Sequence, residues 1–205
     1  NFDIWEIEVT KNGFGTPKNL GKEVNTKGYE DYSYISNDNI LYFASNQREG
    51  FGGLDIWKTE ISYTNYGTIR FKQPENLGPI INTQYDEMSP FIHADNLTLY
   101  FASNGHIGMG NYDLFVSRRG NVERNWEEPK NMGYPINTYK IENSLIVASD
   151  GNTAYYASNQ SGFGKEDIFY FELPEDMQAE HVSDLEIEII GGKKGDEVVL
   201  ENVQF

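Results

Sequence analysis

Short apolar runs, separated by clusters of turn-forming residues, recur along this chain. The run at 40–45 (ILYFAS) returns at 98–103 (TLYFAS) and again at 153–158 (TAYYAS). Aromatic and β-branched residues dominate these runs, which favours strands. No segment shows a sustained 3.6-residue apolar period, so we expect very little helix.

A second motif follows each of these runs, after a Gly-x-Gly-x-x-Asp loop. Asp-Ile-Trp or a close variant starts at Asp55, Asp113 and Asp167, and a fourth example starts at Asp3. These aspartates lie 52, 58 and 54 residues apart. A repeat of this length made of short strands predicts a β-propeller and not a helical array.

Each repeat contains further motifs in a constant order. A proline turn (PKNLG, PENLG, PKNMG) leads to an Asn-Thr pair, which is followed by an acidic step into an apolar run. A tight turn built on Asp-Asn or Asp-Gly then leads into the LYFAS-like strand, as in a hairpin. Each repeat therefore predicts four short strands joined by turns.

The predicted fold is all-β: a propeller of four-stranded antiparallel blades, with three full repeats visible. We expect the strand after the acidic step to lie innermost in its blade and the Asp-Ile-Trp strand to lie third. Propellers contain at least about four blades, so we expect these repeats to belong to a larger ring. Residues 1–173 form the propeller segment in this prediction, 174–184 a polar connector, and 185–205 the start of a β-rich or OmpA-like domain.

The repeat resembles a known family. PENLGPIINTQYDEMSPFIHADNLTLYFASN with its glycine loop, and SDGNTAYYASNQSGFGKEDIF, resemble TolB-type, WD-like propeller repeats. This form of the repeat is similar to the one in OmpA-family, outer-membrane-associated proteins of Bacteroidetes bacteria. The resemblance covers residues 2–173. GDEVVLENVQF resembles the segment that introduces a peptidoglycan-binding OmpA-like domain.

The resemblance implies a periplasmic scaffold associated with the outer membrane, similar to the propeller-bearing component of type IX secretion and gliding machinery. Its implied partners are envelope or secretion-system proteins. Peptidoglycan would be bound through a domain outside this sequence.

The amino-acid composition limits the classes of molecule that this chain is expected to bind. The formal net charge is −16, from 32 acidic and 16 basic residues. Nucleic acid and anionic bilayers are therefore excluded as expected partners, whereas cations and basic protein patches remain. The chain has no cysteine and no long apolar run, so we expect neither disulfides nor a transmembrane helix.

The acidic steps are the candidate partner-binding residues. If the strand that follows each step is innermost, these carboxylates crowd the mouth of a central channel and attract a basic group. They could equally cap local backbone. The third step, Glu142-Asn143, lacks a second acid, which weakens the case for a symmetric ring. The candidate residues are Glu30, Asp31, Asp86, Glu87 and Glu142.

The remaining repeat residues favour architecture. The glycines of Gly-x-Gly-x-x-Asp precede a strand and not a helix, which argues against a phosphate loop. We expect Asp3, Asp55, Asp113 and Asp167 to accept backbone N–H groups in their own loops, with a calcium ligand as the alternative. We expect the aromatic residues that follow them to pack between blades: Trp57, Phe115 and Phe169.

Catalysis has little support in the sequence. His93, His106 and His181 fall at unrelated repeat positions, and no Gly-x-Ser-x-Gly elbow occurs. We therefore expect a non-catalytic scaffold for protein–protein contacts, without cofactor or metal. Two alternatives stay open: a carbohydrate-binding propeller that uses exposed aromatic residues, and a propeller glycosidase that uses two carboxylates.

Overall fold

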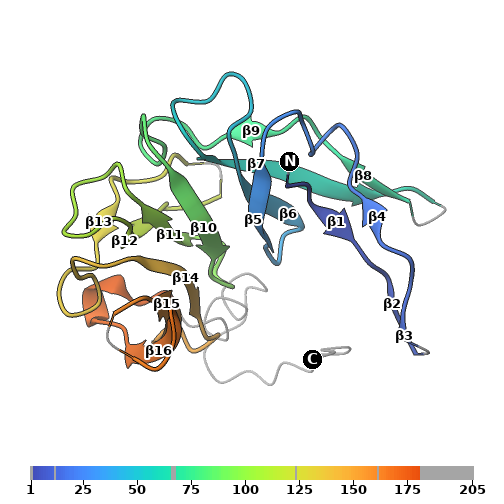
Figure 1. The fold of residues 1–205 in the computed structure, drawn as a ribbon. Coiled ribbons are helices and arrows are strands. Elements are labelled where there is room, and N and C mark those ends of the chain that lie inside the picture. Colours follow the sequence, from blue (N-terminus) through green and yellow to red (C-terminus); the bar gives the residue numbers. More distant parts are fainter. Residues whose placement is uncertain (1, 12, 66–67, 123, 161, 181–205) are drawn as a thin grey trace, which may run out of the picture.

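The computed structural model describes residues 2–11, 13–65, 68–122, 124–160 and 162–180, and within them the protein is all-β. A single turn of 3₁₀ helix, Glu175–Met177, is the one helical element of the described residues. The antiparallel sheets follow one another in chain order around an arc (Figure 1). The described residues do not close this arc into a ring.

Four repeat units make up the arc, and we number them 1 to 4. Unit 1 consists of β1 (Trp5–Glu6), β2 (Val9–Thr10), β3 (Gly13–Phe14) and β4 (Lys18–Asn19). Unit 2 consists of β5 (Glu30–Ile35), β6 (Ile40–Ser45), β7 (Asp55–Tyr63), β8 (Ile69–Phe71) and β9 (Glu75–Asn76). Unit 3 consists of β10 (Glu87–Ile92), β11 (Thr98–Ser103), β12 (Asp113–Arg118) and β13 (Lys130–Asn131). Unit 4 consists of β14 (Glu142–Val147), β15 (Thr153–Ser158) and β16 (Asp167–Glu172).

Units 2, 3 and 4 share the order of their first three strands but differ in strand number, whereas unit 1 consists of two two-stranded sheets, β1-β4 and β2-β3. Unit 3 is a four-stranded sheet in the order β10-β11-β12-β13, with the Asp-Leu-Phe strand third, as the sequence predicts. Unit 2 carries an extra strand, β8, because β7 runs on into a long hairpin. Unit 4 has three strands among the residues that the structure describes.

The first strand of units 2, 3 and 4 carries a bulge at one equivalent position. The pairing of β5 with β6 shifts register between Asp31 and Tyr34, and β10 and β14 shift at the matching points. Each bulge holds a non-glycine residue with left-handed backbone: Tyr32 (φ 50), Ser89 (φ 52) and Ser144 (φ 54). Such residues are uncommon outside glycine, and bulges of this kind re-aim side chains.

Apolar side chains fill the space between neighbouring units. Trp57 packs with Phe43 and Val24 where unit 2 meets unit 1. Phe115 packs with Phe101 and Ile56 where unit 3 meets unit 2. The predicted burial of Trp57 and Phe115 is therefore confirmed.

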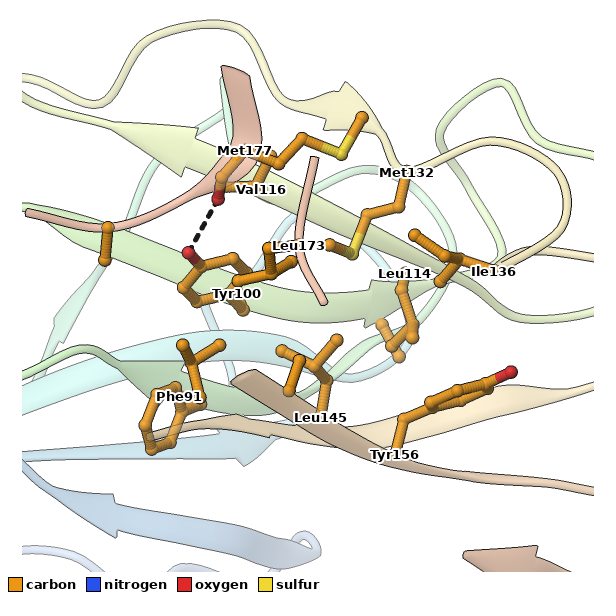
Figure 2. Packing of buried hydrophobic residues seen from close by; sticks show 14 of the residues in the cluster. Phe91, Tyr100, Leu114, Val116, Met132, Ile136, Leu145, Tyr156, Leu173 and Met177 are labelled. Carbon is orange, nitrogen blue, oxygen red and sulfur yellow. Dashed lines mark hydrogen bonds between the residues drawn. The ribbon is translucent and has the colours of Figure 1, made fainter. Parts of the chain in front are cut away.

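The contact between units 3 and 4 is the largest of these clusters. Tyr100, Leu114 and Val116 of unit 3 face Leu145 and Tyr156 of unit 4 (Figure 2). Phe169 packs against this cluster but stays half-buried, so its predicted burial holds only in part.

Residues 173–180, which we call the C-terminal strap, cross from unit 4 back onto unit 3. Met177 and Ala179 are buried, and the Tyr100 hydroxyl donates to the Met177 carbonyl at 2.8 Å (Figure 2). The Ala179 N–H donates to the carbonyl of Gly151 at 3.1 Å. The sequence predicts a polar connector over 174–184, but its first part is a packed element of the core. The predicted domain over 185–205 lies outside the described residues.

Candidate functional site

Three glutamates of the acidic steps are internal to the fold. Glu30, Glu87 and Glu142 are all buried. The Glu87 carboxylate accepts hydrogen bonds from the Thr83 N–H at 2.6 Å, the Thr83 hydroxyl at 2.8 Å and the Ser103 hydroxyl at 2.7 Å. The other two repeat this pattern with their own threonine and serine. Each glutamate therefore fastens the Asn-Thr loop to the second strand.

Burial raises the pKa of Glu87 above its ordinary value, although hydrogen bonds from Thr83 and Ser103 act in the opposite direction. Burial likewise raises the pKa of Asp55. The described groups around Glu87 are hydrogen-bond donors of its own repeat, so the carboxylate is not offered to a partner.

The two aspartates of the acidic steps occupy different positions from one another. Asp86 precedes its buried glutamate, whereas Asp31 follows Glu30. Asp86 is half-buried; its Oδ1 accepts the Leu54 N–H at 2.9 Å and its Oδ2 accepts the Tyr112 hydroxyl at 2.8 Å. Asp31 alone is exposed. The predicted mouth of five free carboxylates is thus corrected: the structure leaves one of them open to solvent.

The Asn-Thr pair has a role that sequence reasoning did not identify. Asn82 receives the Ile56 N–H at 2.8 Å and donates to the Ile56 carbonyl at 3.0 Å, so one amide side chain satisfies both backbone groups. Asn25 makes the same two hydrogen bonds with the backbone of Ile4, and Asn137 makes them with the backbone of Leu114. We call this arrangement the asparagine clamp. It ties each Asn-Thr segment to the third strand of the preceding unit.

The Gly-x-Gly-x-x-Asp loops are built around the aspartate carboxylate, as predicted. Asp113 Oδ2 accepts the N–H groups of Met109 at 2.8 Å and Gly110 at 3.0 Å. A Cβ on Gly108 would lie 1.8 Å from this oxygen, so only glycine fits there. Asp55 and Asp167 accept loop N–H groups in the same way. Asp3 instead accepts from the Asn19 side chain at 2.8 Å.

Replacing Asp113 tests this architectural role against metal binding. We expect Asp113→Ala to lower the free energy of unfolding by about 1–3 kcal/mol, because the partly buried N–H groups of Met109 and Gly110 lose their acceptor. Asp167→Ala, at the half-buried equivalent, should cost less. Urea unfolding measures both values.

Calcium binding is the alternative role for Asp113, and it predicts a different result. The Oδ1 atoms of Asp55 and Asp113 are buried without a hydrogen-bond partner. Within the described part of the chain, however, no three His, Cys, Asp or Glu residues gather in a way that could hold a metal. A rise in melting temperature with calcium that a chelator reverses, lost in Asp113→Ala, would assign these residues to metal binding.

The three bulges meet at one hollow, which we call the bulge groove. It has a volume of about 170 Å³ and is lined by Tyr32, Ser33, Tyr34, Ser89, Pro90, Phe91, Ser144, Leu145 and Ile146. The rings of Tyr34 and Phe91 lie 4.8 Å apart, centroid to centroid, within its wall. The Ser89 hydroxyl is buried and has no hydrogen-bond partner. Left-handed residues concentrated at one place are typical of functional sites.

Negative charge borders this groove. Burial raises the pKa of Tyr32, and the charges of Asp31 and Glu166 raise it further. Burial also raises the pKa of Tyr112, as does the bond of its hydroxyl to Asp86. The raised pKa keeps the Tyr32 hydroxyl protonated, so this groove residue can donate a hydrogen bond beside an acidic rim, whereas the Tyr112 hydroxyl already donates to Asp86.

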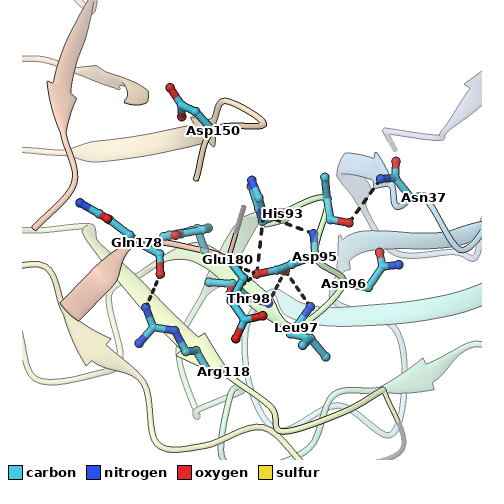
Figure 3. A network of polar contacts seen from close by, with 12 residues as sticks. Asn37, His93, Asp95, Asn96, Leu97, Thr98, Arg118, Asp150, Gln178 and Glu180 are labelled. Atoms are coloured by element: carbon cyan, nitrogen blue, oxygen red, sulfur yellow. Dashed lines mark hydrogen bonds and ion pairs between the residues drawn. The ribbon is translucent and has the colours of Figure 1, made fainter. Parts of the chain in front are cut away.

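His93 belongs to a buried polar network and is not isolated. Its Nε2 lies 3.0 Å from the Ala148 carbonyl of unit 4. Its Nδ1 lies 3.6 Å from Asp95 Oδ2 (Figure 3). Asp95 Oδ2 also accepts the Thr98 hydroxyl at 2.7 Å and the Glu180 N–H at 3.2 Å. The network therefore joins units 3 and 4 to the strap. His106 Nε2 lies 2.8 Å from the Ile81 carbonyl, and His181 is outside the described residues.

The Asp95 carboxyl makes stability depend on pH. Burial raises its pKa, but hydrogen bonds from His93, Thr98 and the Leu97 N–H outweigh this and hold the pKa at about 2. A lowered pKa stabilises the fold above the unfolded-state value and loses that contribution as pH falls through the folded-state value.

We expect Asp95 to contribute about 2 kcal/mol at pH 6, and this contribution to vanish between about pH 5 and pH 2. The stability difference between the native chain and Asp95→Asn, from urea unfolding at each pH, should shrink over this window. A difference that stays constant from pH 6 to pH 2 would contradict the assignment.

Comparisons with known proteins do not assign the chain to a family. A scan against models of known protein families matches none of them, and no curated protein matches the chain. In the part of the chain that the structure describes, no helix has the length and apolar character needed to cross a bilayer.

Proposed function

We propose that the chain is a non-catalytic scaffold in the envelope of a Gram-negative cell, and that its bulge groove holds an extended segment of a partner protein. In this proposal the arc of units is part of a β-propeller, on the periplasmic side of the outer membrane, that presents a rigid surface to secretion or gliding components. Peptidoglycan attachment would come from a domain outside this sequence. The resemblance of the repeats to TolB-type propellers supports the location and the class of partner.

One observation carries the proposal: equivalent bulges of three units converge on one groove. Tyr32, Ser89 and Ser144 hold left-handed backbone at the same repeat position and line the same hollow. Architecture alone does not require a buried, unpartnered hydroxyl such as that of Ser89. A ligand with a backbone N–H or carbonyl at this point would complete it.

The charge around the groove selects the partner segment. Asp31 is exposed beside Tyr32, and the whole chain has a net charge of −16. A segment carrying Lys or Arg next to an apolar side chain would match both the acidic rim and the apolar wall of Phe91 and Leu145. Binding should weaken as salt rises, because the rim charges are exposed.

Site-specific photo-crosslinking tests the proposal. A photoreactive residue at Tyr32 should capture a discrete partner from envelope extracts, whereas the same residue at the exposed Tyr63 should not. Asp31→Asn should reduce capture from Tyr32, and high salt should do the same. Equal capture from both positions, or none from Tyr32 with the fold intact, would contradict the proposal.

A carbohydrate-binding role remains the second candidate. The paired rings of Tyr34 and Phe91 beside the hydroxyls of Ser33 and Ser89 are chemistry that a sugar ring can use. Glycan-array binding that disappears in Tyr34→Ala would favour this candidate over a protein segment. The glycosidase alternative is weaker, because the buried glutamates Glu30, Glu87 and Glu142 are all held by donors of their own repeats.

A further inference from the structure

A pocket at the junction of units 2 and 3 gathers basic side chains in a chain that is otherwise acidic. Its volume is about 410 Å³, which is within the range of sites that hold small ligands. Lys58 and residues 75–80 form the wall from unit 2, and the loop between β12 and β13 forms the wall from unit 3. We call it the junction pocket and define it by Lys58, Glu75, Ile80, Arg119, Arg124 and Trp126.

Arg119 brings a buried positive charge to this pocket. It is 6% exposed, and its guanidinium lies 4.5 Å from the centroid of the Trp126 ring. Its Nε and Nη2 donate to the Asn96 carbonyl at 3.0 and 2.7 Å, and its Nη1 donates to the Val122 carbonyl at 3.2 Å. These carbonyls satisfy hydrogen bonds but carry no net charge. Among the described residues no carboxylate forms an ion pair with this guanidinium, although buried charges are normally paired.

Arg124 adds a second positive charge, on the same wall of the pocket. It is exposed and forms no ion pair with a described residue. On the opposite wall, Lys58 Nζ lies 3.5 Å from Glu75 Oε2, and Glu75 is the single carboxylate in the described lining. The lining therefore holds three cations and one carboxylate, and an anion would be attracted to it.

The crevice between units 1 and 2 shows that this charge is not a property of every junction. It is lined by Glu6, Glu8 and Lys18 among its charged residues. By strand register Glu6 takes the place of Lys58. Lys18 likewise takes the place of Glu75. Two carboxylates and one cation face this crevice, so the basic lining is specific to the junction of units 2 and 3.

The junction between units 3 and 4 shows how a carboxylate completes such a place. Lys130 has the register position of Glu75 and forms an ion pair with Asp176 of the C-terminal strap. The next residue, Met177, is buried in the apolar cluster of that junction. An acidic residue followed by an apolar one therefore neutralises a cation and extends the core at the same time.

We propose that the junction pocket binds an acidic segment of a partner protein, in which an aspartate or glutamate lies beside an apolar side chain. The carboxylate binds Arg124 and Lys58, in the positive field of Arg119. The apolar side chain packs on Leu77 and Ile80, which are only partly buried. This site goes beyond the proposed function, because the bulge groove selects a basic segment and shares no lining residue with the junction pocket.

Nuclear magnetic resonance with a capped peptide tests the proposal on the native chain. The probe is acetyl-Ser-Glu-Asp-Met-Ser-amide, and the matched neutral peptide has Gln and Asn in place of Glu and Asp. We expect the acidic peptide to shift the Trp126 indole N–H and Arg119 Nε–H signals, and the neutral peptide to leave both in place. The Tyr32 ring signals should not move, so this result is independent of the bulge groove.

Charge-matched variants show whether the pocket itself binds the peptide. Arg124→Gln should weaken binding of the acidic peptide about tenfold, because a charge-assisted contact is lost. Arg48→Gln removes the same charge from an exposed loop residue outside the pocket, and it should change the affinity less than about twofold. Both arginines are exposed, so we expect both variants to fold. Equal weakening in the two variants, equal shifts with the neutral peptide, or no shift with the acidic peptide would overturn the proposal.

Two other sources of a carboxylate give different results. Sodium acetate, at the same carboxylate concentration and ionic strength, should leave the Trp126 signal in place. A shift equal to that of the peptide would assign the pocket to a small anion and overturn the proposal. Residues 184–188 of this chain (DLEIE) also combine acidic and apolar side chains. Peptide binding that occurs only after Asp184, Glu186 and Glu188 are replaced by their amides would assign the pocket to this segment and not to a partner.

Discussion

Trp57→Ala should lower the free energy of unfolding by about 3–5 kcal/mol, as large aromatic truncations in protein cores do. Trp57 is 6% exposed and packs with Phe43, Leu41 and Val24 between units 1 and 2. Its indole N–H also donates to the Ser45 carbonyl at 3.3 Å. The substitution removes this packing and leaves a cavity at the junction.

Trp5 is a matched control, because it occupies the same repeat position at the exposed end of the arc. Trp5→Ala should change the unfolding free energy by less than about 1 kcal/mol. Urea unfolding followed by far-ultraviolet circular dichroism measures both variants. A loss below 1 kcal/mol for Trp57→Ala, or equal losses for the two, would show that the junction does not stabilise the arc.

Asn82→Ala should destabilise the chain by about 2–3 kcal/mol, because it leaves a buried backbone N–H without an acceptor and removes one donor from the carbonyl of the same residue, Ile56. The Ile56 N–H would lose its acceptor, while the Ile56 carbonyl and Asn76 Oδ1 would each lose one of two donors and keep the N–H groups of Leu77 and Gly78. The same amide joins unit 3 to unit 2, so exchange of the Ile56 amide should accelerate.

Asn125→Ala is the control for this change, since Asn125 is exposed on a loop of unit 3. It should stay within about 0.5 kcal/mol of the native chain. Should Asn82→Ala prove equally mild, the clamp would be a consequence of unit packing and not one of its causes.

The strand content was predictable because it depends on local pattern. Alternating apolar runs and the turns at Asp38-Asn39 and Asp95-Asn96 specify hairpins, and the structure has them at those places. The recurring aspartates were also predictable, because Asp55 and Asp113 act within their own loops.

Of the two interpretations of the acidic steps, local backbone capping applies to the three glutamates and the channel mouth does not, and the register of the repeats explains why. Glu30 and Glu87 are equivalent, but Asp31 and Asp86 lie on opposite sides of them, so treating each pair as one unit merged three different positions. The spacing of four residues between Thr83 and Glu87, repeated at Thr26–Glu30 and Thr138–Glu142, was the available signal. It indicates a local hydrogen bond and not an open carboxylate.

Other features depend on tertiary contacts and leave little trace in the sequence. Residues 174–180 (PEDMQAE) show no apolar pattern that predicts the burial of Met177 and Ala179 in the core between units 3 and 4. The bulge groove arises only when Tyr32, Ser89 and Ser144 meet from three separate strands. A tyrosine and two serines at one repeat position carry no common chemical signature, so the site could not be predicted.

The central claim is that the repeated carboxylates belong to the fold and that binding takes place at the bulge groove. Carboxyl-detected NMR during titration with a lysine-rich peptide tests it most directly. The account predicts that the Asp31 carboxyl and the Tyr32 ring signals shift with added peptide, while the carboxyl signals of Glu30, Glu87 and Glu142 stay in place. Shifts of the three glutamates together, with Asp31 unchanged, would contradict it.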